Sequence, residues 1–243
     1  MATIAISLAA ILPSSARKVS YKVVSPDGHL SANVVVGKTI TYSVSRDEIN
    51  LIDASDISMT LSDGIVFGEN DKVRKTKINS IDQLLPAIAY KKSEVHDNYN
   101  EITLIFKEFS LTFRAYDEGV AYRFRSLLKT DSKVIAEKAQ FNFAKDWDAY
   151  IPYVKQNAET LESQYCNSFE NTYSIHALSQ WNKERLAFLP IAVSAEGGMK
   201  VLITESDLMN YPGMFLYNEG DATTLSGRFA PYPKTVEQGG HNM

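Results

Sequence analysis

The chain has 243 residues, of which 44% are hydrophobic and 22% are charged, and its net charge is -4. This composition is typical of a soluble globular protein with a sizeable core, and the lack of a basic stripe argues against nucleic acid as a partner. With a single cysteine, Cys166, the chain cannot form an internal disulfide or a cysteine-based zinc site. We interpret Cys166 as a structural residue.

The chain opens with an apolar run at residues 3–12, followed by Pro-Ser-Ser-Ala at residues 13–16. Small residues here are typical of a signal-peptidase site, although the n-region is atypical because no basic residue precedes the run. The run is too short to cross a membrane, and no other segment qualifies. A buried first strand is the alternative, but Arg17 and Lys18 directly after the run favour export. We therefore predict a signal peptide at residues 1–16 and a periplasmic location in a Gram-negative bacterium.

The next segments have the pattern of a β-meander with tight hairpins. The turn sequence Ser-Pro-Asp-Gly at residues 25–28 precedes alternating apolar residues at 30–36, and the alternation resumes at 40–44 after a second turn. Residues 51–60 are less regular. Short strands are predicted on both sides of the turn at residues 62–64.

The middle of the chain contains the clearest strand pair, at residues 102–106 and 109–115. The two residues between these strands permit a tight hairpin or a bulge. The turn Asp-Glu-Gly at residues 117–119 leads into a strand at 120–125. We interpret its two carboxylates as turn residues, because neighbouring side chains of a strand point to opposite faces.

Two segments before this pair are less clear. The charged residues 71–77 are interpreted as a solvated face or an edge strand. Residues 81–90 could form a short helix that is interrupted at Pro86.

The last third continues the strand pattern. Residues 140–143 and 147–153 are candidate strands, whereas residues 160–176 are expected to form a long loop of the kind that is often functional. Hairpins are predicted from 186–193 with 199–204, and from 214–217 with 223–229. One domain of two packed antiparallel sheets is the simplest architecture.

The segment at residues 233–243 has no helix or strand period. We predict that the sandwich occupies residues 17–232 and that 233–243 begin a linker to a further domain. A polar tail is the alternative interpretation.

Four segments resemble, in order, the amino-terminal domain of glycoside hydrolase family 97, and together they extend over residues 21–243. The third is the most discriminating, because a version of the second occurs in other sugar hydrolases with a mutarotase-like sandwich. The segments are the Ser-Pro-Asp-Gly turn at 25–28, Tyr-Asp-Glu-Gly-Val-Ala-Tyr-Arg-Phe at 116–124, Thr-Glu-Ser-Asp-Leu at 204–208 with Tyr-Pro-Gly-Met at 211–214, and Gly-Arg-Phe-Ala-Pro-Tyr-Pro at 227–233.

The resemblance implies an all-β fold, an antiparallel β-supersandwich of the galactose-mutarotase-like kind. In complete enzymes of the family a catalytic (β/α)₈ barrel follows and acts on α-linked oligosaccharides. The family includes inverting α-glucosidases and retaining α-galactosidases, whose catalytic carboxylates lie in the barrel. The chain would then be a non-catalytic carbohydrate-binding or scaffold domain of a secreted α-glycosidase, inactive alone.

The resemblance also implies an active-site calcium ion that receives one glutamate from the amino-terminal domain. By motif match Glu205 is that ligand, and a plain surface carboxylate is the alternative. Calcium takes about six to eight oxygen ligands, so we expect binding only with the barrel present. Glu162 and Glu170 are secondary calcium candidates, and with Tyr173 and Trp181 they are candidate sugar or barrel contacts. Packing in the core is the alternative for the aromatic residues.

Two other functions compete with this interpretation. A free-standing carbohydrate-binding module would use the same sandwich without a barrel. An aldose epimerase would need a histidine acid and a carboxylate base that converge in the concave sheet.

Overall fold

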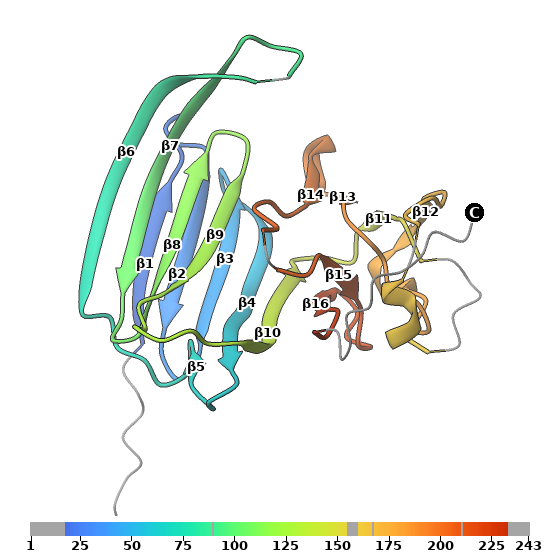
Figure 1. Ribbon diagram of the computed structural model, residues 1–243. Helices are drawn as coiled ribbons and strands as arrows, with labels where there is room; N and C mark the ends of the chain where they lie inside the picture. Colours follow the sequence, from blue (N-terminus) through green and yellow to red (C-terminus); the bar gives the residue numbers. More distant parts are fainter. Residues whose placement is uncertain (1–17, 89, 155–159, 167, 210, 233–243) are drawn as a thin grey trace, which may run out of the picture.

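The computed structural model describes residues 18–88, 90–154, 160–166, 168–209 and 211–232. Within them the chain folds into three antiparallel sheets, and its helices are three short 3₁₀ turns (Figure 1). The predicted all-β supersandwich is therefore confirmed, although the expectation of two sheets was one too few. The predicted signal peptide and the linker at 233–243 lie outside the described residues. No helix in the described part is long and apolar enough to span a membrane.

The largest sheet contains the predicted meander. Residues 51–60, which have no clear period, belong to a single 13-residue strand, because register shifts along its pairing with β3 interrupt the alternation. The sheet has the order β1-β2-β3-β4-β10-β16-β15, with β5 paired to β4. Its strands are β1 (Val19–Val24), β2 (Leu30–Val36), β3 (Ile40–Arg46), β4 (Ile49–Leu61), β5 (Val66–Phe67), β10 (Val134–Phe143), β15 (Met214–Tyr217) and β16 (Thr224–Phe229).

The second sheet packs across the meander and has the order β6-β7-β8-β9. Its strands are β6 (Lys75–Pro86), β7 (Glu94–Ile105), β8 (Phe109–Tyr116) and β9 (Val120–Ser126). The prediction of a short helix at 81–90 was wrong, because β6 pairs with β7 along its whole length, from Lys75 opposite Ile105 to Pro86 opposite Glu94. The continuous backbone pairing between β6 and β7 here outweighs the local helix propensity of residues 81–90.

Aromatic side chains fill the space between these two sheets. Phe109 of β8 stacks on Phe106 and Phe67, with ring centroids 4.2 and 4.7 Å apart. Tyr42 of β3 lies against Phe113 and donates its hydroxyl hydrogen to the carbonyl of Gln140 at 2.8 Å. These rings explain why the aromatic content of the chain is high, since most of them supply buried area rather than a binding face.

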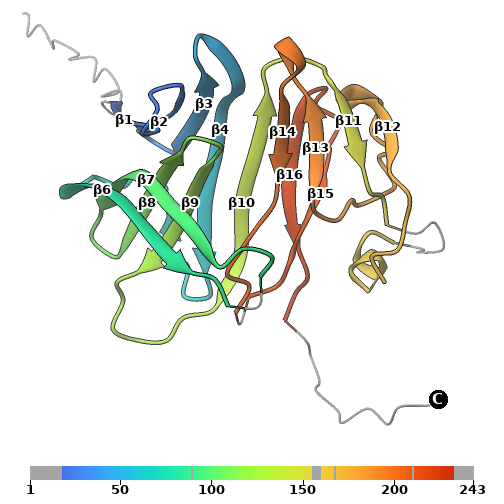
Figure 2. The ribbon, with the colours of Figure 1, turned by 90° about the horizontal axis from the view of Figure 1, so that it is seen from above.

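The third sheet continues the sandwich beyond β10, β15 and β16 (Figure 2). Its strands have four residues each, and short 3₁₀ turns lie between them. The predicted hairpin from 186–193 with 199–204 is confirmed by the pairing of Ile191–Ser194 with Lys200–Ile203. It has the order β12-β11-β13-β14. The elements are β11 (Asp148–Ile151), η1 (Glu162–Tyr165), β12 (Ser174–Ala177), η2 (Leu178–Gln180), β13 (Ile191–Ser194), η3 (Glu196–Gly198) and β14 (Lys200–Ile203).

Candidate functional site

The calcium candidate Glu205 lies in the segment of residues 204–213 that joins β14 to β15, here called the β14–β15 loop. The backbone N–H of Met214 donates to both oxygens of the Glu205 carboxylate, at 2.8 and 3.0 Å. Glu205 is half-buried, and desolvation raises its pKa while the Met214 N–H opposes that effect. The main chain therefore holds a carboxylate whose remaining lone pairs can accept a cation.

A second carboxylate belongs to the same region. The hydroxyl of Tyr211, near the end of the loop, donates to Oε2 of Glu137 on β10 at 2.5 Å. Burial raises the pKa of Glu137, the Tyr211 hydrogen bond opposes this, and the negative charge of Glu205 adds to it. Burial and the bond to Glu137 likewise raise the pKa of Tyr211. Sequence reasoning missed Glu137, because 74 positions separate it from Tyr211.

The loop has another attachment, to the second sheet. Arg123 of β9 forms an ion pair with Asp207 at 2.7 Å, and both side chains are more than half exposed. An exposed pair of this kind contributes little stability. It nevertheless places the loop next to β9. The loop thus contacts β9 through Arg123 and β10 through Glu137, and it leads into β15.

The other predicted site residues lie apart from this group. Glu162 on η1 and Glu170 are exposed, and in the described residues neither shares a hydrogen bond or ion pair with Glu205. Tyr173 is 46% exposed and donates its hydroxyl to the carbonyl of Pro190. Trp181 is only 4% exposed and donates its indole N–H to the Arg185 carbonyl, so it packs in the core. Cys166 is an exposed free thiol.

A tyrosine–histidine pair in the third sheet also escaped sequence reasoning. The Tyr153 hydroxyl lies 3.0 Å from Nε2 of His176, accepts from the Asn182 N–H at 2.9 Å, and its ring stacks on the imidazole. Burial raises the pKa of Tyr153 to about 12. The guanidinium of Arg185 lies 5.3 Å from the ring centroid. This cluster fastens β12 to the turn after Trp181.

The histidine–carboxylate pairs bear on the epimerase alternative. His29 with Asp47 and His96 with Asp82 are both 2.6 Å apart, but all four side chains are more than half exposed. Each pair joins two neighbouring strands or their connecting turns, so neither one lies in an enclosed pocket. In the parts of the chain that the structure describes, these pairs do not supply the converging acid and base of that reaction.

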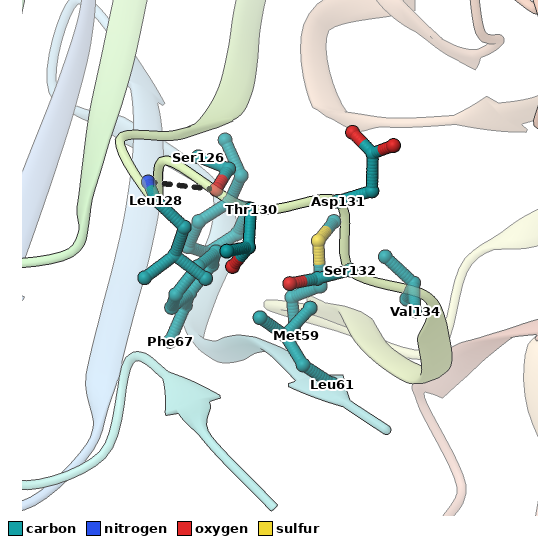
Figure 3. Close-up of a pocket in the computed structure, with 10 residues that line it drawn as sticks. Met59, Leu61, Phe67, Ser126, Leu128, Thr130, Asp131, Ser132 and Val134 are labelled. Atoms are coloured by element: carbon teal, nitrogen blue, oxygen red, sulfur yellow. Dashed lines mark hydrogen bonds between the residues drawn. The ribbon is translucent and has the colours of Figure 1, made fainter. Parts of the chain in front are cut away.

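A pocket of about 280 Å³ opens at one end of the sandwich (Figure 3). Its floor is apolar, formed by residues such as Met59, Leu61 and Phe67, and its rim carries hydroxyls and the single carboxylate of Asp131. Glycoside hydrolysis requires two carboxyl groups across the scissile bond, and this pocket has one. The pocket is therefore a gap between sheet ends rather than an active site.

Glu205 by itself does not make a cation site. In the described ranges no group of three or more His, Cys, Asp or Glu side chains could hold a metal ion. Calcium requires about six to eight oxygens. Glu205 fits as one hard, oriented ligand, and the remaining oxygens would have to come from outside these residues.

The sequence is similar to a family of sugar-cleaving enzymes. Residues 23–235 match the family model described as Glycosyl-hydrolase 97 N-terminal. Over 225 residues the chain is 44% identical to the retaining alpha-galactosidase of Bacteroides thetaiotaomicron, a match that covers 92% of this chain and 34% of that protein. The chain thus spans about a third of the length of this curated relative.

Solved structures share the fold. A glycoside hydrolase family 97 enzyme from Pseudoalteromonas sp. strain K8, in complex with acarbose, has a TM-score of 0.71 at 20% identity, covering 86% of this chain and 32% of that one. A crystal structure of a beta-arabinopyranosidase has a TM-score of 0.72 at 22% identity, covering 86% and 35%. With the family model matched from β1 to the end of the last strand, the chain belongs to glycosyl hydrolase family 97, and residues 23–235 are its N-terminal domain.

Proposed function

We propose that this chain is the scaffold domain of an exported α-glycosidase, packs on a catalytic (β/α)₈ barrel of the same polypeptide, and supplies Glu205 to a calcium ion at the active site. The observation that carries the proposal is the half-buried Glu205 carboxylate, which accepts hydrogen bonds from the Met214 N–H with both oxygens. A carboxylate oriented by the main chain is suited to binding and is poorly explained as a surface charge.

The calcium ion would provide Lewis-acid chemistry at the sugar when bound. Glu205 would hold it from one side, and barrel residues would complete the oxygen shell. The Glu137–Tyr211 and Arg123–Asp207 contacts would keep the β14–β15 loop in place. The chain's own contribution is thus to orient the Glu205 side chain before the metal binds. This reduces the entropy that the side chain loses when it binds the ion.

An α-linked oligosaccharide is the proposed substrate class. Support comes from the relative named as a retaining alpha-galactosidase and from the family 97 structure in complex with acarbose. The choice of sugar would belong to the barrel, since the described residues offer no enclosed site with two acids.

A chimera tests the proposal. In it, this chain replaces the matching N-terminal third of the Bacteroides thetaiotaomicron retaining alpha-galactosidase. We expect the chimera to hydrolyse p-nitrophenyl α-galactoside and to lose activity when calcium is chelated. Glu205→Ala should raise the calcium concentration for half-maximal activity at least about tenfold, because losing a group that merely supports a metal ligand already costs about 10- to 100-fold in affinity.

Glu162→Ala is the matched control, because it removes an exposed glutamate from the same domain, and it should leave the calcium titration unchanged. Near-ultraviolet circular dichroism of each variant verifies that the sandwich is intact. An active chimera whose calcium dependence is the same with and without Glu205 would remove this residue from the site.

A further inference from the structure

The outer edge of the second sheet is unusually open. β6 (Lys75–Pro86) is the last strand of that sheet, and it pairs with β7 on one side only. Every residue of β6 except Ile81 is exposed, so both of its faces as well as its free edge meet solvent. Figure 1 shows β6 as the outermost strand of the molecule, extending past β1.

The exposed edge is also apolar. Ile78 is 79% exposed, Leu84 63% and Leu85 42%. Proteins normally protect a free edge with charges, prolines or a short strand. In β6 the lysines lie at the start and Pro86 lies at the end, so that Asp82 is the one charge in the stretch from Ile78 to Leu85. An edge of this length and character is a template for another strand.

We propose that β6 is the interface at which two copies of this chain pair, strand against antiparallel strand, about a two-fold axis perpendicular to the sheet. Such an axis keeps the same faces of both copies together. Each residue must therefore pair with one that lies an even number of positions away in the sequence. The two four-stranded sheets would join into one continuous sheet, and neither copy would keep an open edge there.

Of the registers with the axis at Ser80, Ile81 or Asp82, the one at Ile81 suits the side chains best. With the axis at Ile81, Ile78 of each copy lies opposite Leu84 of the other, so the most exposed apolar residues of the strand cover each other. Ser80 lies opposite Asp82, where a hydroxyl can donate to the carboxylate. Two Ile81 side chains meet at the axis itself.

The neighbouring registers are unfavourable because of Asp82. An axis at Ser80 places the Asp82 carboxylate opposite the apolar Ile78. An axis at Asp82 places the two carboxylates opposite each other, and like charges in directly opposed positions destabilise a pair of strands. The side chains of the edge are therefore self-complementary, and Asp82 sets the register in which a second copy docks.

Sedimentation velocity of the purified chain over a range of concentrations tests the interface. We expect a concentration-dependent dimer, and Ile78→Lys and Leu84→Lys should each raise its dissociation constant at least about tenfold. Leu202→Lys is the matched control, because Leu202 is 59% exposed on β14 of the third sheet, and it should leave the dimer unchanged.

A cysteine experiment tests the register in a Cys166→Ser background. Directly opposed residues of antiparallel strands have Cα atoms about 4.5 to 5.5 Å apart, a separation that a disulfide accepts. Ile81→Cys should therefore oxidise to a covalent dimer. Two cysteines at Gln83 would lie four positions apart, about 13 Å, and should remain reduced.

These outcomes decide the proposal without reference to glycosidase activity. A chain that stays monomeric at every concentration, or a dimer that Ile78→Lys and Leu84→Lys leave intact, overturns it. Equal cross-linking of the Ile81→Cys and Gln83→Cys variants overturns the register.

Discussion

At the scale of single residues, the contact between Tyr211 and Glu137 is the most informative feature of the loop region. A half-buried carboxylate is expensive unless it is hydrogen-bonded, and the Tyr211 hydroxyl satisfies it at 2.5 Å. We predict that Tyr211→Phe lowers the free energy of unfolding by about 1.5 to 3 kcal/mol, the usual loss when a bond to a charged group is removed. Urea unfolding measures this. Tyr232→Phe, a change on a half-exposed ring, should cost almost nothing.

The same carboxylate makes stability depend on pH. Because the pKa of Glu137 is raised in the folded state from an ordinary value of 4.5, the folded protein binds more protons than the unfolded chain as pH rises above that value. The free energy of unfolding should therefore fall across this window until Glu137 is ionised in both states.

Glu137→Gln tests this dependence. The substitution keeps an acceptor for Tyr211 and removes the charge, so the variant should gain stability over the wild type near pH 7. The gain should shrink as pH falls toward 4.5, because the wild-type carboxyl is then protonated. A stability difference that stays constant with pH would show that burial does not perturb this group.

At the scale of elements, the packing of β8 on the large sheet depends on Phe109. Its ring is 1% exposed and stacks on two other phenylalanines. We predict that Phe109→Ala lowers the free energy of unfolding by about 3 to 5 kcal/mol, because it leaves a cavity between the sheets. Phe169→Ala, which removes a ring that is 56% exposed, should cost much less in the same unfolding experiment.

The elements also show what the sequence could predict. Strands that alternate strictly, such as β2 and β8, were found with nearly correct bounds, since one face of each is buried. Residues 81–86 of β6 were mistaken for a helix, because a strand exposed on both faces has no alternation to detect. In the third sheet the hairpin at 186–193 and 199–204 was predicted correctly. Most of β12 lies in the segment that was predicted to be a loop, because its four residues are too few for a period to emerge.

The site was only partly predictable for a related reason. Glu205 was identified through the motif at residues 204–208 and 211–214, which lies in one continuous stretch of sequence. Glu137 and His176 gain their partners from strands far away in the sequence, at separations of 74 and 23 positions. Local sequence patterns contain no information about such contacts. They also did not predict that Trp181 is buried.

At the scale of the whole molecule, the domain by itself should be inert. We predict that the purified chain hydrolyses neither p-nitrophenyl α-galactoside nor the α-glucoside, because its described residues place no two acids across an enclosed pocket. Isothermal titration should detect no calcium binding below about millimolar concentration, since one glutamate cannot replace the ion's hydration shell. Turnover that persists through purification would contradict this expectation.

Export is testable on the whole chain as well. If residues 1–16 are a signal peptide, expression in a Gram-negative host should yield a periplasmic product that begins at Arg17. Intact-mass measurement of the periplasmic fraction determines this. A full-length product that is retained in the cytoplasm would contradict the prediction.

The Met214 N–H that holds Glu205 has a consequence for how the domain can evolve. Every amino acid except proline has this main-chain donor, so an apolar replacement that fits the buried site of Met214 keeps the hydrogen bond. The orientation of the Glu205 carboxylate thus depends on the backbone of β15 rather than on the identity of the side chain at position 214. Sequences in which this position drifts among apolar residues can keep the same geometry, and a Met214→Pro lineage would lose it at once.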